Sequence, residues 1–281
     1  MSSLMKNWPI KSDHHLEAAL GMSIKEIDAI ITDLDVKMEE TAFYYSFIKK
    51  QVKRNGKIKS RLISPSKMKL SLVQDRIKDR ILIQIPLPEY IHGGRKKHDG
   101  LTNAKEHQGK NNHFCTDLKD FFPYVSNKKV YNVFDSLGFI PDIARRLTRL
   151  VTYNGHLPQG ASTSTAMANL VFYFEIGKPL EKLLKDKNIT MTSFVDDLSL
   201  SSEQKFDGIE NLVLAQILKA GFLYNHQKTV LKMGKIDMTG ANVRQNRLQA
   251  PLSIKDKLNE PHRTDQSKKG VLNYIKRVEI A

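Results

Sequence analysis

Apolar positions recur along this chain at two spacings, and each spacing predicts a different kind of element. Apolar residues three or four positions apart favour an amphipathic helix, whereas alternation favours a strand with one buried face. Helical spacing occurs in these segments: 12–50 (a helix pair), 70–84, 128–137, 142–153, 162–185 and 207–220. Strand-like patterns occur in these: 51–69 (with Asn55-Gly56 as a hairpin turn), 113–125 (stopped by Pro123), 189–202, 229–231 and 237–248. The glycine-rich stretch 92–109 predicts a loop.

The order of these elements predicts the fold class. From residue 113 onward, a strand is followed by helices, two strands around a tight turn, a helix and a further strand. This order is close to the split βαββαβ arrangement of an α+β fold. It predicts that the strand starting at His113 and the strand pair at 189–202 are neighbours at the centre of one sheet.

Two adjacent acidic residues, Asp196 and Asp197, lie at the predicted turn of the strand pair. A lone Asp-Asp turn is most simply a solvated turn, but here Asp117 ends the strand predicted to lie beside it. Neighbouring carboxylates repel each other unless a cation lies between them, and hard cations such as Mg²⁺ prefer carboxylate oxygen. Three carboxylates at one sheet edge can hold two Mg²⁺ ions about 3.5–4 Å apart for an in-line phosphoryl transfer.

Charge and composition narrow the class of partner. The formal net charge of +15 favours a polyanion, and nucleic acid more than a membrane. No apolar run approaches the roughly 18–20 residues that cross a bilayer, and the first residues lack the apolar core of a secretory signal. The single cysteine, Cys115, excludes an internal disulfide. We therefore expect a cytoplasmic nucleic-acid enzyme built on a template-dependent polymerase palm.

The basic hairpin at 51–69 has two open interpretations. Seven Lys or Arg residues lie close together in it, including Lys59 and Arg61. Charge alone is equally consistent with a solvated surface hairpin. Alternatively, Arg61 and a nearby lysine bind a triphosphate or a nucleic-acid backbone.

Several motifs in their order along the chain resemble those of bacterial reverse transcriptases. Phe194-Val195-Asp196-Asp197 resembles the Tyr-x-Asp-Asp box of that family, with Phe in place of Tyr. The run 117–123 (DLKDFFP) resembles the first catalytic motif, and Leu157-Pro158-Gln159-Gly160 resembles the segment before the helix under the incoming nucleotide. Asn225 with Lys228-Thr229 resembles the Asn-x-x-Lys-Thr element that follows.

Two further motifs resemble retron-type enzymes in particular. Residues 103–107 (Asn103-Ala104-Lys105-Glu106-His107) match an Asn-Ala-x-x-His signature, and Met238-Thr239-Gly240 stands where Val-Thr-Gly is typical. The resemblance covers most of the chain. It implies an RNA-directed DNA polymerase with a right-hand fold, including fingers and a split βαββαβ palm. It also implies that synthesis starts from a 2′-OH of a structured non-coding RNA and yields a branched RNA–DNA product, in a setting of anti-phage defence.

The resemblance also assigns roles to individual residues. Asp117 and Asp196 would bridge two Mg²⁺, with Asp197 as a weaker ligand, and Phe122 would lie under the sugar and select dNTPs. The following residues would contact the nucleotide or the template backbone: Arg61, Lys59, Gln159, Gly160 and Lys228. The Thr239-Gly240 turn would support the primer end. The open alternative is that Phe122 is a core aromatic residue.

Asn103, Lys105 and His107 lie in a basic loop, and we expect this loop to face the template RNA. Asn and His can hydrogen-bond to sugars or base edges, and the lysines would contact phosphates. The open alternative is that Asn103 and His107 brace the loop against the palm.

Domain organisation follows from these assignments. We expect N-terminal helices at 1–50, fingers and the retron-like loop at 51–112, the palm at 113–250, and a short thumb or tail at 251–281. With so short a thumb, an effector protein or self-association would compensate in gripping the template and primer. Two alternatives remain: a related defence reverse transcriptase that primes on protein or makes untemplated DNA, and a relic palm that only binds RNA. The intact Asp117, Asp196 and Asp197 argue against the relic.

Overall fold

The computed structural model describes residues 10–36, 44–54 and 57–280, without the side chains of residues 36 and 52–59. The predicted Asn55-Gly56 turn and the side chain of Lys59 therefore lie outside the described part. The chain divides into two compact units, each built from separate stretches of sequence. We call Met1–Leu87 with Asp120–Phe174 the helical unit, and Pro88–Lys119 with Glu175–Ala281 the sheet unit.

The helical unit contains most of the predicted helices and the predicted basic hairpin. Its elements are α1 (Asp13–Leu20), α2 (Ile24–Val36), β1 (Ile48–Arg54), β2 (Lys57–Ile63), α3 (Met68–Arg80), η3 (Leu82–Gln84), α5 (Phe121–Tyr124), α6 (Asn127–Ser136), α7 (Pro141–Val151) and α8 (Ser164–Phe172). Strands β1 and β2 pair antiparallel, which confirms the hairpin. Ser126 caps the start of α6, where its side chain accepts a hydrogen bond from the Lys129 N–H.

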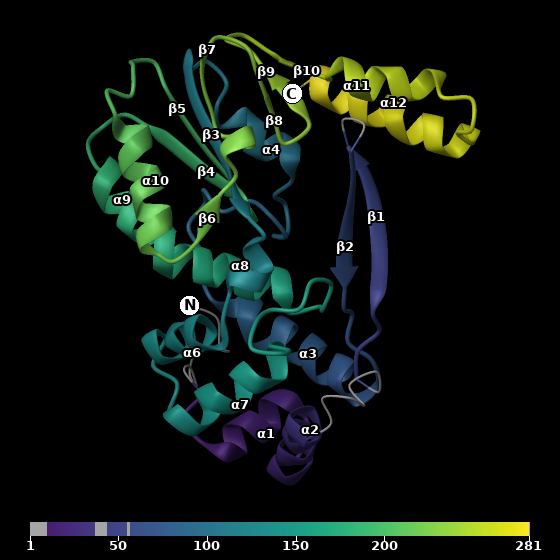
Figure 1. Cartoon of the computed structure of the whole chain (residues 1–281), viewed down its shortest axis with the longest axis vertical. Helices are drawn as coiled ribbons and strands as arrows, with labels where there is room; N and C mark the ends of the chain where they lie inside the picture. The colour runs from purple at the N-terminus through teal and green to yellow at the C-terminus, as the bar shows by residue number, and fades with distance from the viewer. Residues whose placement is uncertain (1–9, 37–43, 55–56, 281) are drawn as a thin grey trace. The chain divides into compact units, whose positions relative to one another are not determined.

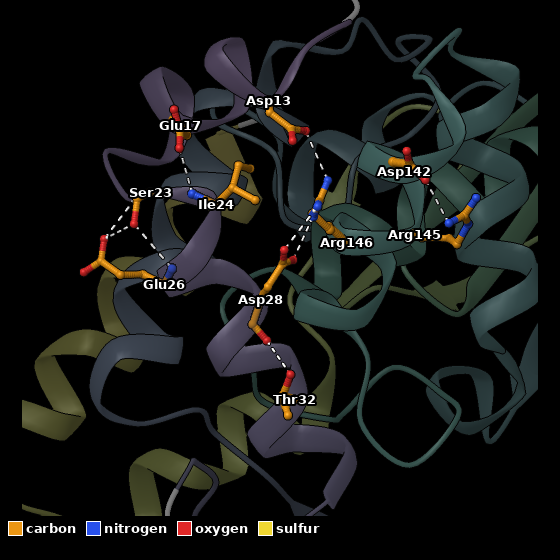
Figure 2. A network of polar contacts seen from close by, with 10 residues as sticks. All are labelled: Asp13, Glu17, Ser23, Ile24, Glu26, Asp28, Thr32, Asp142, Arg145 and Arg146. Atoms are coloured by element: carbon orange, nitrogen blue, oxygen red, sulfur yellow. Dashed lines mark hydrogen bonds and ion pairs between the residues drawn. The ribbon is translucent and has the colours of Figure 1, made fainter.

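Charged contacts attach the N-terminal helix pair to α7 (Figure 2). Arg146 donates through Nε and Nη2 to the two oxygens of Asp28 on α2, at 2.8 and 3.1 Å, and through Nη1 to Asp13 on α1 at 3.1 Å. Such a bidentate pair fixes direction as well as distance. Ser23 and Glu26 form a capping box, with the Ser23 N–H donating to the Glu26 carboxylate and the Glu26 N–H donating to Ser23 Oγ. The capping box and the contacts of Arg146 therefore orient α1 and α2 relative to α7.

The sheet unit contains the predicted palm (Figure 1). Its main sheet comprises β3 (Asn112–Lys119), β4 (Thr190–Phe194), β5 (Asp197–Ser202), β6 (Leu223–Tyr224) and β7 (Val230–Met233). The strand order is β4-β5-β3-β6, and β7 also pairs with β3. All of these pairings are antiparallel. Helices α9 (Lys178–Leu184) and α10 (Ile209–Lys219) complete the predicted split βαββαβ arrangement, which is confirmed.

The long helix predicted at 162–185 is helical but not uniform. A π-helical turn, Tyr173–Gly177, separates α8 from α9. Pro179 near the start of α9 has no N–H to donate to the carbonyl of Glu175, four residues earlier. Gln216 on α10 donates to that carbonyl instead, at 3.1 Å. The proline thus accounts for the changed helical register at this position.

A second, smaller assembly in the sheet unit joins the retron-like motifs. It contains α4 (Gly100–Lys105), β8 (Ile236–Met238), β9 (Ala241–Val243), β10 (Leu248–Gln249), α11 (Leu252–Lys255), η6 (Asp256–Asn259) and α12 (Asp265–Ile280), with strand order β10-β9-β8. Its buried members, which we call the C-terminal core cluster, are Leu101, Ala104, Ile236, Met238, Ala241, Val243, Leu248, Ala250 and Val278. Helix α4 corrects the prediction of a loop at 92–109: the Asp99 side chain caps it, accepting from the N–H groups of Leu101 and Thr102.

Candidate active site

The three predicted carboxylate residues meet at the turn end of β3 and β5. Asp117 on β3 is the register partner of Asp197, the first residue of β5. Asp196 lies in the turn between β4 and β5, and its carbonyl accepts a hydrogen bond from the Leu118 N–H at 2.7 Å. Asp117 is 6% exposed, whereas Asp197 is exposed. Antiparallel pairing therefore places one sheltered and two more accessible carboxylate residues at one edge.

The turn that contains Asp196 is strained. Phe194 pairs with Asp197, so only Val195 and Asp196 form the turn. Val195 has φ of +62°, a conformation that β-branched residues rarely adopt and that costs about 1–3 kcal/mol. Such a conformation persists only where neighbouring structure enforces it. The turn that contains Asp196 is therefore held in place by its surroundings.

Lys228 provides a positive charge beside the carboxylates. Its Nζ lies 2.5 Å from Asp117 Oδ2. The Asn225 N–H donates to the Asp117 carbonyl at 2.8 Å, and the Asn225 side chain accepts from the Gln227 N–H. The Asn-x-x-Lys element thus binds the end of β3 and directs the lysine at Asp117. This contact was missed from the sequence; contact of Lys228 with a nucleotide stays a prediction.

The carboxylates suit a hard divalent cation in their chemistry. Carboxylate oxygen is the ligand that Mg²⁺ prefers, and Asp117 and Asp197 as cross-strand neighbours need a compensating cation. In the structure Lys228 compensates Asp117. Within the described ranges, no three His, Cys, Asp or Glu side chains are gathered closely enough to hold a metal ion. The carboxylates therefore match such an ion in donor type, although their side chains are not gathered around one point here, and Lys228 is the group that an ion at Asp117 would displace.

His107 lies beneath this sheet, not at its surface. Its ring nitrogens hydrogen-bond to Ser201 Oγ on β5 and Thr192 Oγ1 on β4, both at 2.7 Å, and the side chain is fully buried. Burial lowers the pKa of His107 to about 3, so the ring is neutral and joins two strands. The expectation that His107 faces RNA is wrong in this structure, because its partners are hydroxyls of the palm sheet.

Asn103 is buried as well, and it connects the two retron-like motifs. Its Nδ2 donates to Thr239 Oγ1 at 3.3 Å, and Thr239 Oγ1 donates to the Gly100 carbonyl at 2.6 Å. Thr239 and Gly240 both have positive φ, as the two central residues of a type I′ hairpin turn require. Tyr274 on α12 donates to the Gly240 carbonyl at 2.9 Å. Asn103 is 1% exposed, again contrary to the expected RNA-facing position, whereas Lys105 is exposed.

The other predicted site residues belong to the helical unit. Arg61 is exposed on β2, and Phe122 is half-buried beside the core residue Phe121. The Gln159 carbonyl accepts from the Ser64 N–H at 2.6 Å, and Gly160, with φ of +105°, packs on Ile63. A side chain at Gly160 would clash with Ile63. The structure joins the Pro-Gln-Gly turn to the base of β2, and the nucleotide contacts of these residues stay predictions.

Comparison with known proteins shows the family of this chain. The profile of the family "Reverse transcriptase (RNA-dependent DNA polymerase)" matches residues 48–245, which include all three aspartates. The chain belongs to the reverse transcriptase family. Enzymes with this domain depend in general on divalent metal ions.

Curated relatives place the chain near the retron branch, confirming that resemblance. It is 30% identical over 233 residues to the Retron Se72 reverse transcriptase of Salmonella heidelberg (strain 579083-10), covering 81% of this chain and 59% of that protein. It is 28% identical to the Retron Ec86 reverse transcriptase of Escherichia coli, covering 78% and 66%. For the Retron Mx65 reverse transcriptase of Myxococcus xanthus the identity is 26%, covering 83% and 58%. The chain thus spans about three fifths of the length of these relatives.

Solved structures support the fold. A telomerase from Candida albicans, solved with a TWJ fragment of telomeric RNA, matches with a TM-score of 0.53 over 82% of this chain and 51% of that chain. Apo telomerase from Candida tropicalis matches with a TM-score of 0.50 over 79% and 60%. Both are 11% identical in sequence, so they show the α+β right-hand polymerase fold alone, which confirms that prediction. Among the described residues, no helix combines the length and apolar character needed to cross a bilayer.

The buried His107 predicts a particular dependence of stability on pH. Its pKa is lowered from 6.5 to about 3 in the folded chain, so the unfolded chain binds the extra proton between these values. The free energy of unfolding should therefore fall as pH falls below 6.5, with His107 contributing about 1 kcal/mol per pH unit. Urea unfolding at pH 7, 6 and 5 measures this slope. His107→Asn should be less stable at pH 7 but show a flatter slope.

His14→Asn is the matched control, because His14 is exposed on α1. It should keep the wild-type slope. A His107→Asn slope equal to that of wild type would contradict the assignment of a buried neutral ring.

Proposed function

We propose that the chain is an RNA-directed DNA polymerase of the retron type, which copies a structured non-coding RNA into cDNA. The observation that supports this most strongly is the pairing of Asp117 with Asp197, with Asp196 in the adjoining turn, within a reverse transcriptase domain. A domain that only bound RNA would not need three carboxylates beside a strained turn. Binding a polyanionic template is consistent with the net charge of +15.

In this proposal Asp117, Asp196 and Asp197 hold two Mg²⁺ ions. Ions bound there would supply the charge that activates the attacking hydroxyl and neutralises the departing diphosphate. Lys228 moves from Asp117 to the phosphates of the incoming dNTP when the site fills. Arg61 and Lys59 bind the β- and γ-phosphates, and the Pro-Gln-Gly turn, Gln159 with Gly160, contacts the nucleotide or the template backbone.

The retron-like motifs at 103–107 and 238–240 support RNA as the substrate in this proposal. Asn103 and His107 hold the shape of the Thr239-Gly240 turn and of the palm sheet, and that turn supports the primer end. The exposed Lys105 contacts RNA phosphates. Synthesis then begins at a 2′-OH of the RNA and gives a branched RNA–DNA product, in the cytoplasm and in anti-phage defence. An effector protein or a second copy of the chain would compensate for the short thumb in gripping the template and primer.

The first test replaces a metal-binding carboxylate. Asp196→Asn and Asp117→Asn should each lower Mg²⁺-dependent dNTP incorporation on an annealed RNA template and DNA primer at least 10³-fold. The physical reason is the loss of several kcal/mol of transition-state stabilisation when an ionic ligand becomes an amide. Steady-state primer extension measures it, and circular dichroism checks folding.

Asp207→Asn is the matched control. Asp207 is an exposed aspartate of the same unit with φ of +49°, a conformation that Asn tolerates well. It should keep wild-type extension. Extension by Asp196→Asn within threefold of wild type would refute the assignment of the active site.

The second test concerns the choice of sugar. If Phe122 lies under the deoxyribose, Phe122→Val leaves room for a 2′-OH and should raise the use of ribonucleotides relative to dNTPs at least tenfold. The measurement is kcat/KM for both nucleotide classes. Tyr124→Val, an exposed aromatic residue on the same short helix α5, should leave the ratio unchanged. An unchanged ratio in Phe122→Val would make Phe122 a packing residue only.

A further inference from the structure

The segment Tyr90–Gly93 lies along β4 like one more strand of the palm sheet. The Ser193 N–H donates to the Tyr90 carbonyl at 2.8 Å, and the His92 N–H donates to the Ser193 carbonyl at 2.8 Å. Ile91 and Ser193 form a parallel bridge. These contacts end directly before the catalytic turn, since Phe194 is the last residue of β4. The backbone leading into the turn is therefore held by β5 on one side and by this segment on the other.

Gly93, the last residue of the segment, packs directly against the turn at Val195. A Cβ atom at Gly93 would lie 2.5 Å from both the backbone N and Cγ2 of Val195, and 2.9 Å from the carbonyl carbon of Phe194. Gly93 has no positive φ, so glycine is needed here for space and not for its backbone conformation. Two of the three clashing atoms belong to backbone, and backbone can yield only if the turn moves. The Gly93 backbone is thus in direct contact with the strained Val195.

The segment is itself firmly anchored. Ile91 and His92 are buried. Arg95 Nη1 donates to the carbonyls of Pro88 and Ile91, both at 2.7 Å. His92 Nδ1 hydrogen-bonds to Thr102 Oγ1 on α4 at 3.1 Å. Because the segment is anchored and has no room for a side chain at Gly93, it limits where the turn at Val195 can lie.

We propose that Tyr90–Gly93 is a positioning element that sets the place of the catalytic turn. Gly93 keeps Val195 in its positive-φ conformation, and through Val195 it fixes Asp196 and Asp197 relative to Asp117. Gly93 acts through its contact with Val195 and Phe194, so it is a positioning residue and not a catalytic one. The expected change in kcat rests on the proposed polymerase function. The expected change in the position and mobility of the turn does not, and it can be measured without polymerase activity.

The direct test is Gly93→Ala. The added methyl group pushes the turn away from the segment, so kcat for dNTP incorporation should fall at least tenfold. The KM for dNTP should stay within threefold, and the Mg²⁺ concentration for half-maximal activity should rise severalfold, because the carboxylates are displaced while the nucleotide contacts remain. Gly270→Ala is the control: Gly270 is exposed on α12 with open space around it and no positive φ. It should match wild type.

A rescue variant separates positioning from general damage. In Gly93→Ala/Val195→Gly the turn loses the clashing Cγ2 and gains a residue that accepts positive φ freely. It should recover at least a third of the kcat lost in Gly93→Ala. Wild-type kcat and Mg²⁺ dependence in Gly93→Ala would overturn the proposal, and so would a loss of kcat that Val195→Gly leaves unrelieved.

Hydrogen exchange provides the readout that does not depend on polymerase activity. In Gly93→Ala, amides 193–198 should exchange at least tenfold faster than in wild type, while those of β9 keep their rate. If the wild-type chain failed to extend any primer, the proposed function would fail, but this exchange result would still decide the positioning role. Should Gly93→Ala not fold, Arg95→Met removes the two hydrogen bonds to the segment and should reduce kcat about threefold. Unchanged kcat with faster exchange in Arg95→Met would overturn the proposal.

Discussion

The site depends on one interaction, the antiparallel pairing of β3 with β5. This pairing sets Asp117 opposite Asp197 and brings the Leu118 N–H to the carbonyl of Asp196. A slip of one residue would turn Asp117 to the other face of the sheet and separate the carboxylates. Two residues after β6 also bind the end of β3 and so support this register. Asn225 binds the end of β3, and the Lys228 ammonium lies against Asp117. The chemistry of the site is thus determined by backbone hydrogen bonds.

The retron-like motifs have a structural role in maintaining that register. Helix α4 contacts the small sheet through Asn103, which binds Thr239, and the turn after it contacts the palm through His107, which bridges β4 and β5. Its apolar side chains enter the C-terminal core cluster. Motifs 103–107 and 238–240, separated by more than a hundred residues, therefore form one assembly. The Asn103 amide nitrogen and both ring nitrogens of His107 find hydrogen-bond partners inside the protein, as most buried polar groups do.

The sequence predicted what depends on local pattern, and failed where partners lie far along the chain. Alternation and element order were sufficient for the palm strands and for the place of Asp117, Asp196 and Asp197. His107 was expected at the surface because it follows a basic, glycine-rich stretch, yet its partners, Thr192 and Ser201, come from strands much later in the sequence. Helix α4 was missed because Gly100 begins it, although Asp99 is a good cap. Each of the two compact units is built from two separate stretches of the chain, and the division into consecutive domains stays a prediction.

Anomalous diffraction from crystals grown with Mn²⁺, an annealed template and primer, and a non-hydrolysable dNTP tests the central claim most directly. Mn²⁺ takes oxygen ligands as Mg²⁺ does and gives a signal that locates it. The account predicts two peaks about 3.5–4 Å apart, ligated by Asp117 and Asp196, with Lys228 no longer bound to Asp117. A fully bound dNTP with no peak at these aspartates, and with Lys228 still bonded to Asp117, would contradict it.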